Sequence, residues 1–292
     1  MKAAPYLTAA IARDSSYAAA YAGLASVYVS TNDTLRARAF SEKALALDST
    51  VAEAHMVRGM IRQFLDWDLK GSEQSLREAI RLNPGFAEAY HELSMLLQRV
   101  KRFDEALHAG RRAVALAPTS LRFINGIGEV LLSAGRNADA LAVSDQVLTT
   151  DSTFGNAYQI RAVAYEQLEQ WDQATSAWLA CVRVTPNFFA ARVRLAYIAA
   201  RTGDTTEAKE VLRALEARVN KANHSGDQEF AEYLARVHMG LGNRAQALTW
   251  LERAVDARSG TTLYLAVDRA YIPLHEEPRF QALLKRIGLP TG

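Results

Sequence analysis

Residues 87–120 read AEAYHELSMLLQRVKRFDEALHAGRRAVALAPTS, and this stretch decides the fold. Its first half places apolar side chains at helical spacing, at Tyr90, Leu93, Leu96 and Leu97. A short polar turn at residues 101–104 precedes a second helical pattern over residues 105–116. Pro118 cannot continue that helix, and the hydroxyl residues after it are suited to cap the next one. The stretch therefore predicts one antiparallel pair of helices.

The same pattern recurs along the chain at a step of 34 residues, or close to it. One series of small residues heads the second helix of each unit: Ala37, Ala106, Ala140, Ala174, Ala208 and Ala247. A second series follows it: Ala44, Ala79, Ala113, Val147, Cys181, Leu215 and Ala254. A fixed period of this length is typical of a repeat array. The sequence thus predicts an all-α solenoid in which stacked helix pairs share one elongated core.

The period divides the chain into seven expected units, 18–51, 52–86, 87–120, 121–154, 155–188, 189–227 and 228–260. Residues 1–17 match only the second helix of a unit, and residues 261–292 are expected to form C-terminal capping helices. An unpartnered half hairpin leaves an apolar face uncovered, so we expect the chain to be part of a longer protein. We also expect the sixth unit to break at residues 223–227, which makes this segment the candidate hinge.

The repeated unit resembles the tetratricopeptide repeat (TPR) family. Residues 155–188 carry the signature positions of that family at Tyr158, Ala162, Tyr165, Ala174, Trp178 and Pro186, with Cys181 where alanine is usual. Ser49 and Ser152 depart from the closing proline. The resemblance implies a right-handed superhelical solenoid that mediates protein–protein interactions.

Two segments narrow the resemblance further. Residues 267–290 are similar to the closing segment of TPR regions in bacterial signalling proteins, namely serine/threonine kinases, winged-helix transcription regulators and adenylate cyclases. The element Asp66-Trp67-Asp68 is similar to one in the same group. In those proteins the TPR region is C-terminal and non-catalytic. The resemblance therefore implies a sensor or docking role.

Composition excludes several classes of partner. The 292 residues include 34 basic and 32 acidic side chains, a balance that argues against nucleic acid. No stretch approaches the roughly 18 consecutive apolar residues of a membrane helix, so no membrane insertion is expected. Without a signal peptide the sequence favours the cytoplasm, or an extracytoplasmic site if an upstream part spans a membrane. The single cysteine, Cys181, is expected to act as a small buried hydrophobe.

No pattern of catalytic or metal-binding residues is recognised, so we predict neither an enzyme nor a cofactor. His91-Glu92 does not extend to a zinc-protease motif. The spacing of Asp66, Asp68 and Gly71 is that of a calcium loop, but later ligand positions hold basic residues, which favours a simple turn. Gly126-x-Gly128 lies inside a helix and is interpreted as close helix packing.

The remaining candidate site is the concave groove, lined in TPR arrays by the first helix of each unit. Carried onto this chain, its residues are Met56, Met60, His91, Glu92, Met95, Asn125, Glu129, Gln159, Arg194, Tyr197, Arg201, Tyr233 and Arg236. The early positions are soft and mildly acidic. The later ones combine arginine and tyrosine, residue types enriched at binding hot spots and suited to a carboxylate ligand.

We therefore predict that a peptide or a partner helix binds in the groove. The chaperone-tail clamp of some TPR proteins is excluded, because its lysine and asparagine positions are filled here by Ala22, Ser26, Val57, Glu88 and Glu92. Two alternatives stay open. The uncovered face of residues 3–14 can pair with a second copy to form a homodimer, or the array can hold a substrate for a catalytic domain elsewhere.

Overall fold

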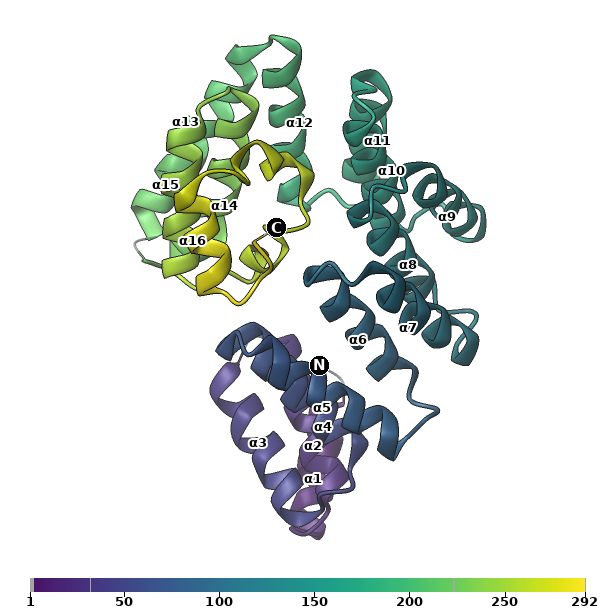
Figure 1. The fold of residues 1–292 in the computed structure, drawn as a ribbon. Coiled ribbons are helices and arrows are strands. Elements are labelled where there is room, and N and C mark those ends of the chain that lie inside the picture. Colours follow the sequence, from purple (N-terminus) through teal and green to yellow (C-terminus); the bar gives the residue numbers. More distant parts are fainter. Residues whose placement is uncertain (1–2, 32, 223, 292) are drawn as a thin grey trace. The chain divides into compact units, whose positions relative to one another are not determined.

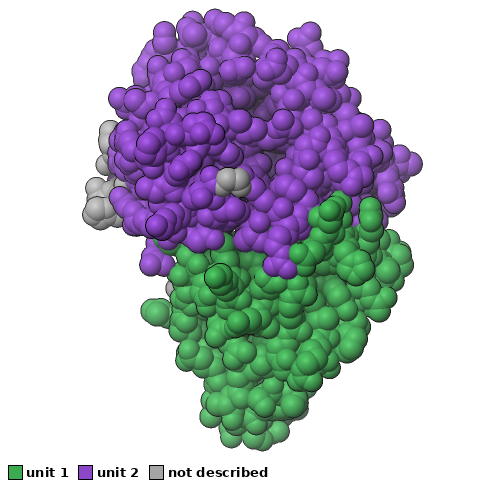
Figure 2. All heavy atoms as spheres, in the orientation of Figure 1, with its two compact units in different colours: residues 1–97, 104–123 green, residues 98–103, 124–292 purple. Residues whose placement is uncertain are grey.

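The computed structural model describes residues 3–31, 33–222 and 224–291, and over these residues it is all-α, without a β-strand (Figure 1). The chain divides into two compact units, which Figure 2 colours separately. Unit 1 comprises residues 1–97 and 104–123, and unit 2 comprises residues 98–103 and 124–292. Helices α6 (Ala87–Arg99), α7 (Phe103–Leu116) and α8 (Leu121–Ser133) contribute residues to both.

Within unit 1 the helices that precede α6 are α1 (Ala4–Arg13), α2 (Ala18–Ser30), α3 (Thr34–Leu47), α4 (Ala52–Ile61), a π-helical turn η1 (Arg62–Asp66) and α5 (Leu69–Leu82). Unit 2 continues with α9 (Asn137–Thr150), α10 (Gly155–Gln167), α11 (Trp171–Val184), α12 (Phe189–Thr202), α13 (Thr205–Ala222), α14 (His224–Gly240), α15 (Arg244–Asp256), two 3₁₀ helices η2 (Gly260–Tyr264) and η3 (Arg269–Leu274), and α16 (Pro278–Arg286).

The small residues of the two periodic series explain why the helices pair. Each of the thirteen side chains in these series is 0% exposed, from Ala37 to Ala254. In the hairpin of α10 and α11, Ala162 and Ala174 lie in one buried cluster with Trp178 and Cys181. Short side chains let the two helix backbones approach, and larger neighbours fill the remaining space at interior packing density.

Gly128 shows how closely neighbouring hairpins pack. A Cβ atom at this position would lie 2.5 Å from Ile160 Cδ1 and 3.3 Å from Val143 Cγ1. Because Gly128 has no side chain, α9 and α10 can pack closely against α8. This agrees with the interpretation of Gly126-x-Gly128 as a site of close helix packing. The Cys181 thiol is fully buried, and burial raises its pKa to about 11, so it behaves as the expected small hydrophobe.

The segment at residues 66–68 forms a turn whose carboxylates are engaged within the protein. Asp66 pairs with Arg38 at 2.6 Å. Trp67 adopts a left-handed backbone with φ 57°, and Asp68 Oδ1 accepts the backbone N–H of Gly71 at 2.8 Å to cap α5. The expected unit 52–86 is one residue longer than the period of 34, and the preceding π turn accommodates this extra residue. The carboxylates thus stabilise a helix junction, in agreement with the simple turn predicted from the sequence.

The region around α13 and α14 differs from the expectation. Helix α13 reaches Ala222. Residues 224–227, expected to belong to a break, are helical at the start of α14, whereas Asn223 lies outside the described residues. The two helices are joined by a cluster of buried apolar side chains that includes Leu215, Val219 and Leu234. This burial favours helix over the loop that Ser225 and Gly226 suggested.

The C-terminal region contains more than the expected capping helices. Helix α16 packs against α15, but the segment before it, residues 260–274, consists mainly of two 3₁₀ helices that contact α14. Five of its apolar side chains are deeply buried: Leu263, Leu265, Val267, Tyr271 and Leu274 are all at most 8% exposed. We call residues 260–274 the inner segment. In the described part of the chain no helix is both long and apolar enough to cross a membrane.

Candidate functional site

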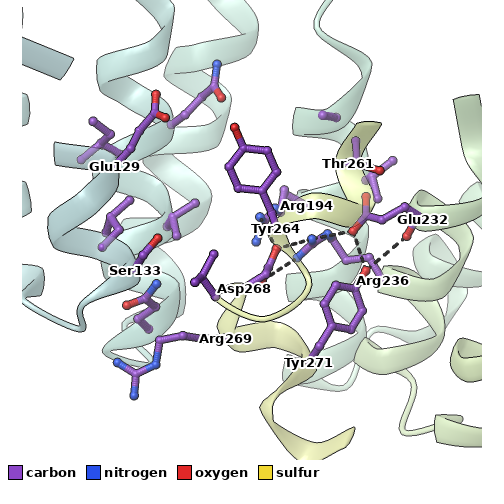
Figure 3. Close-up of a pocket in the computed structure, with 18 of the residues that line it drawn as sticks. Glu129, Ser133, Arg194, Glu232, Arg236, Thr261, Tyr264, Asp268, Arg269 and Tyr271 are labelled. Carbon is purple, nitrogen blue, oxygen red and sulfur yellow. Dashed lines mark hydrogen bonds and ion pairs between the residues drawn. The ribbon is translucent and has the colours of Figure 1, made fainter. Parts of the chain in front are cut away.

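A cavity of about 410 Å³ lies between the inner segment and the helices of unit 2 (Figure 3). Its walls come from the end of α6, from α8, α10, α12 and α14, and from the inner segment itself. Five of the predicted groove residues line it, namely Glu129, Gln159, Arg194, Tyr233 and Arg236. The first helices of successive pairs therefore bring these positions together, while the inner segment closes the space opposite them.

Asp268 of the inner segment bridges two of the predicted arginines. Its Oδ2 atom accepts from Arg236 Nη2 at 2.5 Å and from Arg194 Nη2 at 3.4 Å, and the backbone N–H of Ala270 donates to its Oδ1 at 3.0 Å. Burial opposes ionisation of this carboxyl, but the two guanidiniums outweigh that cost and hold the pKa of Asp268 well below its usual range. Asp268 is thus a carboxylate at every physiological pH.

Each of these arginines also has a second carboxylate partner. Arg194 Nη1 lies 2.9 Å from Glu166 Oε2, and Arg236 Nη2 lies 2.7 Å from Glu232 Oε1. The sequence predicts a ligand carboxylate at Arg194 and Arg236. In the structure the carboxylates on them belong to the chain itself, one of them from a segment that was expected to cap the solenoid.

Two aromatic donors complete this charge network. Trp178 Nε1 donates to Glu166 at 2.5 Å, and the Tyr271 hydroxyl donates to Glu232 at 2.5 Å. Burial raises the pKa of Tyr271, and the neighbouring Glu232 adds to the effect. The network links α10, α12 and α14 to η3, and Figure 3 shows its α14 and inner-segment members converging beside the cavity.

A second contact fixes the other end of the inner segment. Arg99 Nη2 donates to the Tyr264 hydroxyl at 2.5 Å, and the guanidinium also lies 4.6 Å from the centre of the Tyr264 ring. Such a cation–π contact adds to the hydrogen bond when the pair is shielded from water. Arginines of the repeat helices therefore hold the inner segment at two places: at Tyr264 in η2, and at Asp268, the residue that precedes η3.

A smaller cavity of about 270 Å³ lies on α10, α12 and η3 and contains two more of the predicted residues, Tyr197 and Arg201. Burial raises the pKa of the Tyr197 hydroxyl, and the nearby Glu166 carboxylate adds to the shift. The Arg201 guanidinium stands 5.7 Å from the Trp171 ring and is 3.8 Å from Glu169. We call this space the second cavity and the larger one the first cavity.

The predicted positions in the early units are mostly buried. Met56, His91, Glu92 and Met95 are between 6% and 8% exposed, and Met60 is half-buried. Glu92 accepts from Arg122 at 2.7 Å, and the His91 ring lies 5.1 Å from that of Phe123. Asn125, 2% exposed, donates to Glu129 at 3.1 Å. These side chains, predicted as open groove positions, are engaged in packing or internal hydrogen bonds.

Several residues of the first cavity were not predicted from the sequence, chiefly Ser133, Tyr264, Asp268, Arg269 and Tyr271. Four of them belong to the inner segment, which lies outside the periodic pattern. The available signal was the charged pair Asp268-Arg269 within an otherwise apolar stretch. In the part of the chain that the structure describes, no group of three or more His, Cys, Asp or Glu side chains is placed to hold a metal ion.

Comparison with known proteins identifies the family. Tetratricopeptide repeat families match residues 18–50, 91–153 and 161–223, which together make up more than half of the chain. The chain belongs to the tetratricopeptide repeat family. Repeats of this kind generally serve as scaffolds for protein–protein interaction.

Curated relatives match only in part. The chain is 27% identical over 166 residues to a DnaJ homolog subfamily C member 7 homolog of Schizosaccharomyces pombe, an alignment that covers 51% of this chain and 35% of that protein. It is 24% identical over 173 residues to the BBSome complex member BBS4 of Bos taurus, covering 58% and 33% respectively. The chain thus spans about a third of the length of these relatives.

Solved structures show the same fold. PilW, a type IV pilus biogenesis factor, is similar with a TM-score of 0.59 at 23% identity, over 70% of this chain and 94% of that chain. Yeast Tom70 also gives a TM-score of 0.59, at 14% identity, over 98% of this chain and 61% of that chain. At these identities the likeness establishes the all-α TPR fold.

Proposed function

We propose that the chain is a docking module that binds a segment of a partner protein in the first cavity. The observation that supports this proposal is the cavity of about 410 Å³, lined by groove positions of four successive helix pairs. Of the two ligands expected from the sequence, we take the extended peptide, because its backbone groups can pair with polar side chains of the cavity wall.

The polar groups of one wall suit a peptide backbone. Gln159 Nε2 donates to Asn156 Oδ1 at 3.2 Å. With respect to the described residues, Asn156 Nδ2 and Gln159 Oε1 have no hydrogen-bond partner, so one donor and one acceptor remain side by side. A peptide unit offers one acceptor and one donor in return. Apolar lining residues such as Val163 and Leu265 would contact its side chains.

The experiment that tests this proposal is selection of an amidated random nonapeptide library on the immobilised chain, followed by binding measurements on two variants. Gln159→Trp fills the first cavity from α10, whereas Gln146→Trp adds the same side chain at an exposed position of α9. Selected peptides should lose at least about tenfold in affinity with the first variant and none with the second. Failure to select any peptide, or equal binding to both variants, would refute the proposal.

We further propose that the module belongs to a larger bacterial signalling protein. This rests on the resemblance of residues 267–290 and of Asp66-Trp67-Asp68 to TPR regions of such proteins. The test is to sequence the complete transcript that encodes this chain. A kinase, winged-helix or cyclase domain in the same reading frame supports the proposal, and a full transcript without one contradicts it.

A second candidate function, self-association, is favoured by helix α1. None of its residues is buried, and Tyr6 is 79% exposed, whereas the next helix carries several fully buried alanines. Light scattering over a concentration series should show a dimer that Tyr6→Ser returns to monomer. A mass that stays monomeric up to the highest concentration would eliminate this candidate.

A further inference from the structure

The second cavity shares a wall with the first. Val163, Gln167, Arg194, Asp268 and Arg269 line both, so the two spaces lie on either side of the ion pair between Arg194 and Asp268. A peptide bound along α10 in the first cavity therefore has the second cavity beside it. The chemistry of the second cavity therefore bears on what such a peptide carries.

One side of the second cavity is apolar. Trp171, Tyr197, Met239, Ile272 and Pro273 line it, and Ile272 is 47% exposed although Tyr271 and Leu274 of the same 3₁₀ helix are buried. An isoleucine that turns away from the core beside a tryptophan and a tyrosine leaves an apolar surface that a ligand side chain can cover. Aromatic and aliphatic anchors of this kind carry most of the energy at protein interfaces.

Two arginines of the second cavity, Arg201 and Arg269, differ from Arg194 because their guanidinium groups are available to a ligand. The Arg201 side chain is 43% exposed, and its only ion-pair partner among the described residues is Glu169, which is 72% exposed and 3.8 Å away. An exposed pair at that distance contributes little and exchanges readily. Arg269 is exposed and makes no hydrogen bond or ion pair with any residue that the structure describes.

The carboxylates of the second cavity do not offset these two arginines. Glu166 and Asp268 are both bonded to Arg194, and Asp268 also to Arg236, so neither is available to a ligand. Glu169 alone remains beside Arg201 and Arg269, which leaves a surplus of one positive charge among the exposed groups. The charge balance thus favours an anionic group on the ligand.

We propose that the second cavity binds an apolar side chain together with a neighbouring Asp or Glu side chain of the docked peptide, the carboxylate contacting Arg201 and Arg269. This inference rests on the proposed function, since it describes one part of the same bound peptide. Guanidinium groups pair with a carboxylate through parallel N–H donors, which gives both strength and direction. The carboxylate is assigned to a side chain, so that a peptide without a free C-terminus can supply it.

The test uses the same amidated nonapeptide library, in which every carboxylate belongs to a side chain. Peptides selected on the unaltered protein should be enriched in an apolar residue next to Asp or Glu. A selected peptide and its Glu→Gln or Asp→Asn counterpart are then measured on the double variant Arg201→Gln, Arg269→Gln. The matched control is Arg192→Gln, an exposed arginine of the same helix α12 that lines neither cavity.

We expect the loss of affinity caused by the protein substitutions to depend on whether the peptide carries the carboxylate or the amide. The acidic peptide should bind the double variant about tenfold more weakly than the unaltered protein, while the amide peptide binds both alike. The variant Arg201→Lys, Arg269→Lys should show a partial loss, because lysine keeps the charge but not the paired donors. Arg192→Gln should bind both peptides as the unaltered protein does.

The outcomes separate this inference from the proposed function. Peptides selected without acidic enrichment, or an equal loss for acidic and amide peptides, would overturn the inference and leave peptide docking intact. A library from which no peptide is selected would overturn both. Far-ultraviolet circular dichroism of each variant shows that a loss of binding does not come from unfolding, and the lysine variant preserves the test should the glutamine variant prove unstable.

Discussion

The hairpin of α10 and α11 and the inner segment are neighbours in unit 2, yet they are held in place by opposite means. The hairpin is joined by contacts between fully buried small side chains such as Ala162 and Ala174, twelve residues apart in the sequence. The inner segment is held by ion pairs and hydrogen bonds from distant helices, such as Arg194 to Asp268 and Arg99 to Tyr264.

This difference separates the contacts that every unit of a repeat array can share from those that occur only once in the chain. Contacts within a hairpin recur with the period, so every unit of such an array can use the same solution. The contacts of the inner segment occur once, and they use charges that are costly to bury unless every partner is present. We expect the periodic positions of the hairpins not to tolerate larger side chains, and the ionic positions of the inner segment not to tolerate loss of charge. Four predictions test this expectation.

The largest effect is expected from Asp268→Asn. This change removes the charge shared by Arg194 and Arg236, whose side chains are 17% and 6% exposed, and leaves each with one carboxylate. Removing one partner of a buried ion pair is strongly destabilising, so we expect a loss of about 3 kcal/mol in the free energy of unfolding by urea. Asp172→Asn, at an exposed position of α11, should cost less than about 0.5 kcal/mol.

Acid unfolding tests the same role of Asp268, and its depressed pKa sets the direction in which stability should change with pH. Because the pKa of Asp268 is depressed in the folded protein, its carboxylate contributes stability that is present above the unfolded pKa of about 3.9 and is lost as the pH falls toward the folded pKa. The unaltered protein should therefore lose stability below about pH 4 more steeply than Asp268→Asn does. Parallel curves for the two proteins would contradict the assigned role of Asp268.

The next effect concerns the hairpin. Ala174→Leu inserts three carbon atoms into the fully buried cluster with Ala162, Trp178 and Cys181. Overpacking of a close-packed interior costs about 1–3 kcal/mol, which urea unfolding should detect. Ala214→Leu, at an exposed position of α13, is the control and should be close to neutral. A loss as large at Ala214 as at Ala174 would remove the argument for size selection at the periodic positions.

A smaller effect is expected at the other end of the inner segment. Tyr264→Phe deletes the hydroxyl that accepts from Arg99 while keeping the ring beneath the guanidinium. The loss of one partly buried hydrogen bond should lower the free energy of unfolding by about 1 kcal/mol. Tyr158→Phe, which removes an exposed hydroxyl that donates to Ser152 at 3.2 Å, should have a smaller effect. Equal costs at both tyrosines would show that Arg99 does not anchor the segment.

The smallest effect is expected at Cys181, whose thiol should not react with a disulfide reagent while the hairpin is folded. Burial raises the pKa of this thiol to about 11, so at pH 8 the thiolate fraction is roughly two hundredfold below that of an ordinary cysteine with pKa about 8.5. A disulfide reagent at pH 8 should leave the native chain unmodified and react once per chain in urea. Rapid modification of the folded protein would mean that the packing of α10 against α11 opens readily.

The sequence predicted the hairpins well because their determinants are local. All thirteen side chains of the two periodic series are completely buried in the structure, and Gly128 was correctly interpreted as a packing position. The groove was predicted less fully. Glu129, Gln159 and Tyr233 line the first cavity, but Met56 and Met95, chosen by the same rule, are buried. A position on the inner face of a helix does not reveal what else packs on it.

The sequence by itself determined that this chain folds as paired helices of the tetratricopeptide repeat family, because small residues at a fixed period leave one efficient way to pack. Tertiary structure alone decided the character of the candidate site. Asp268 is 74 residues from Arg194, and Tyr264 is 165 residues from Arg99. A local sequence pattern cannot predict these pairs. They form because a non-repeating segment is buried, and buried charged and polar groups are stable only when they are paired. That burial occupies two predicted arginines and leaves Arg201 and Arg269 exposed.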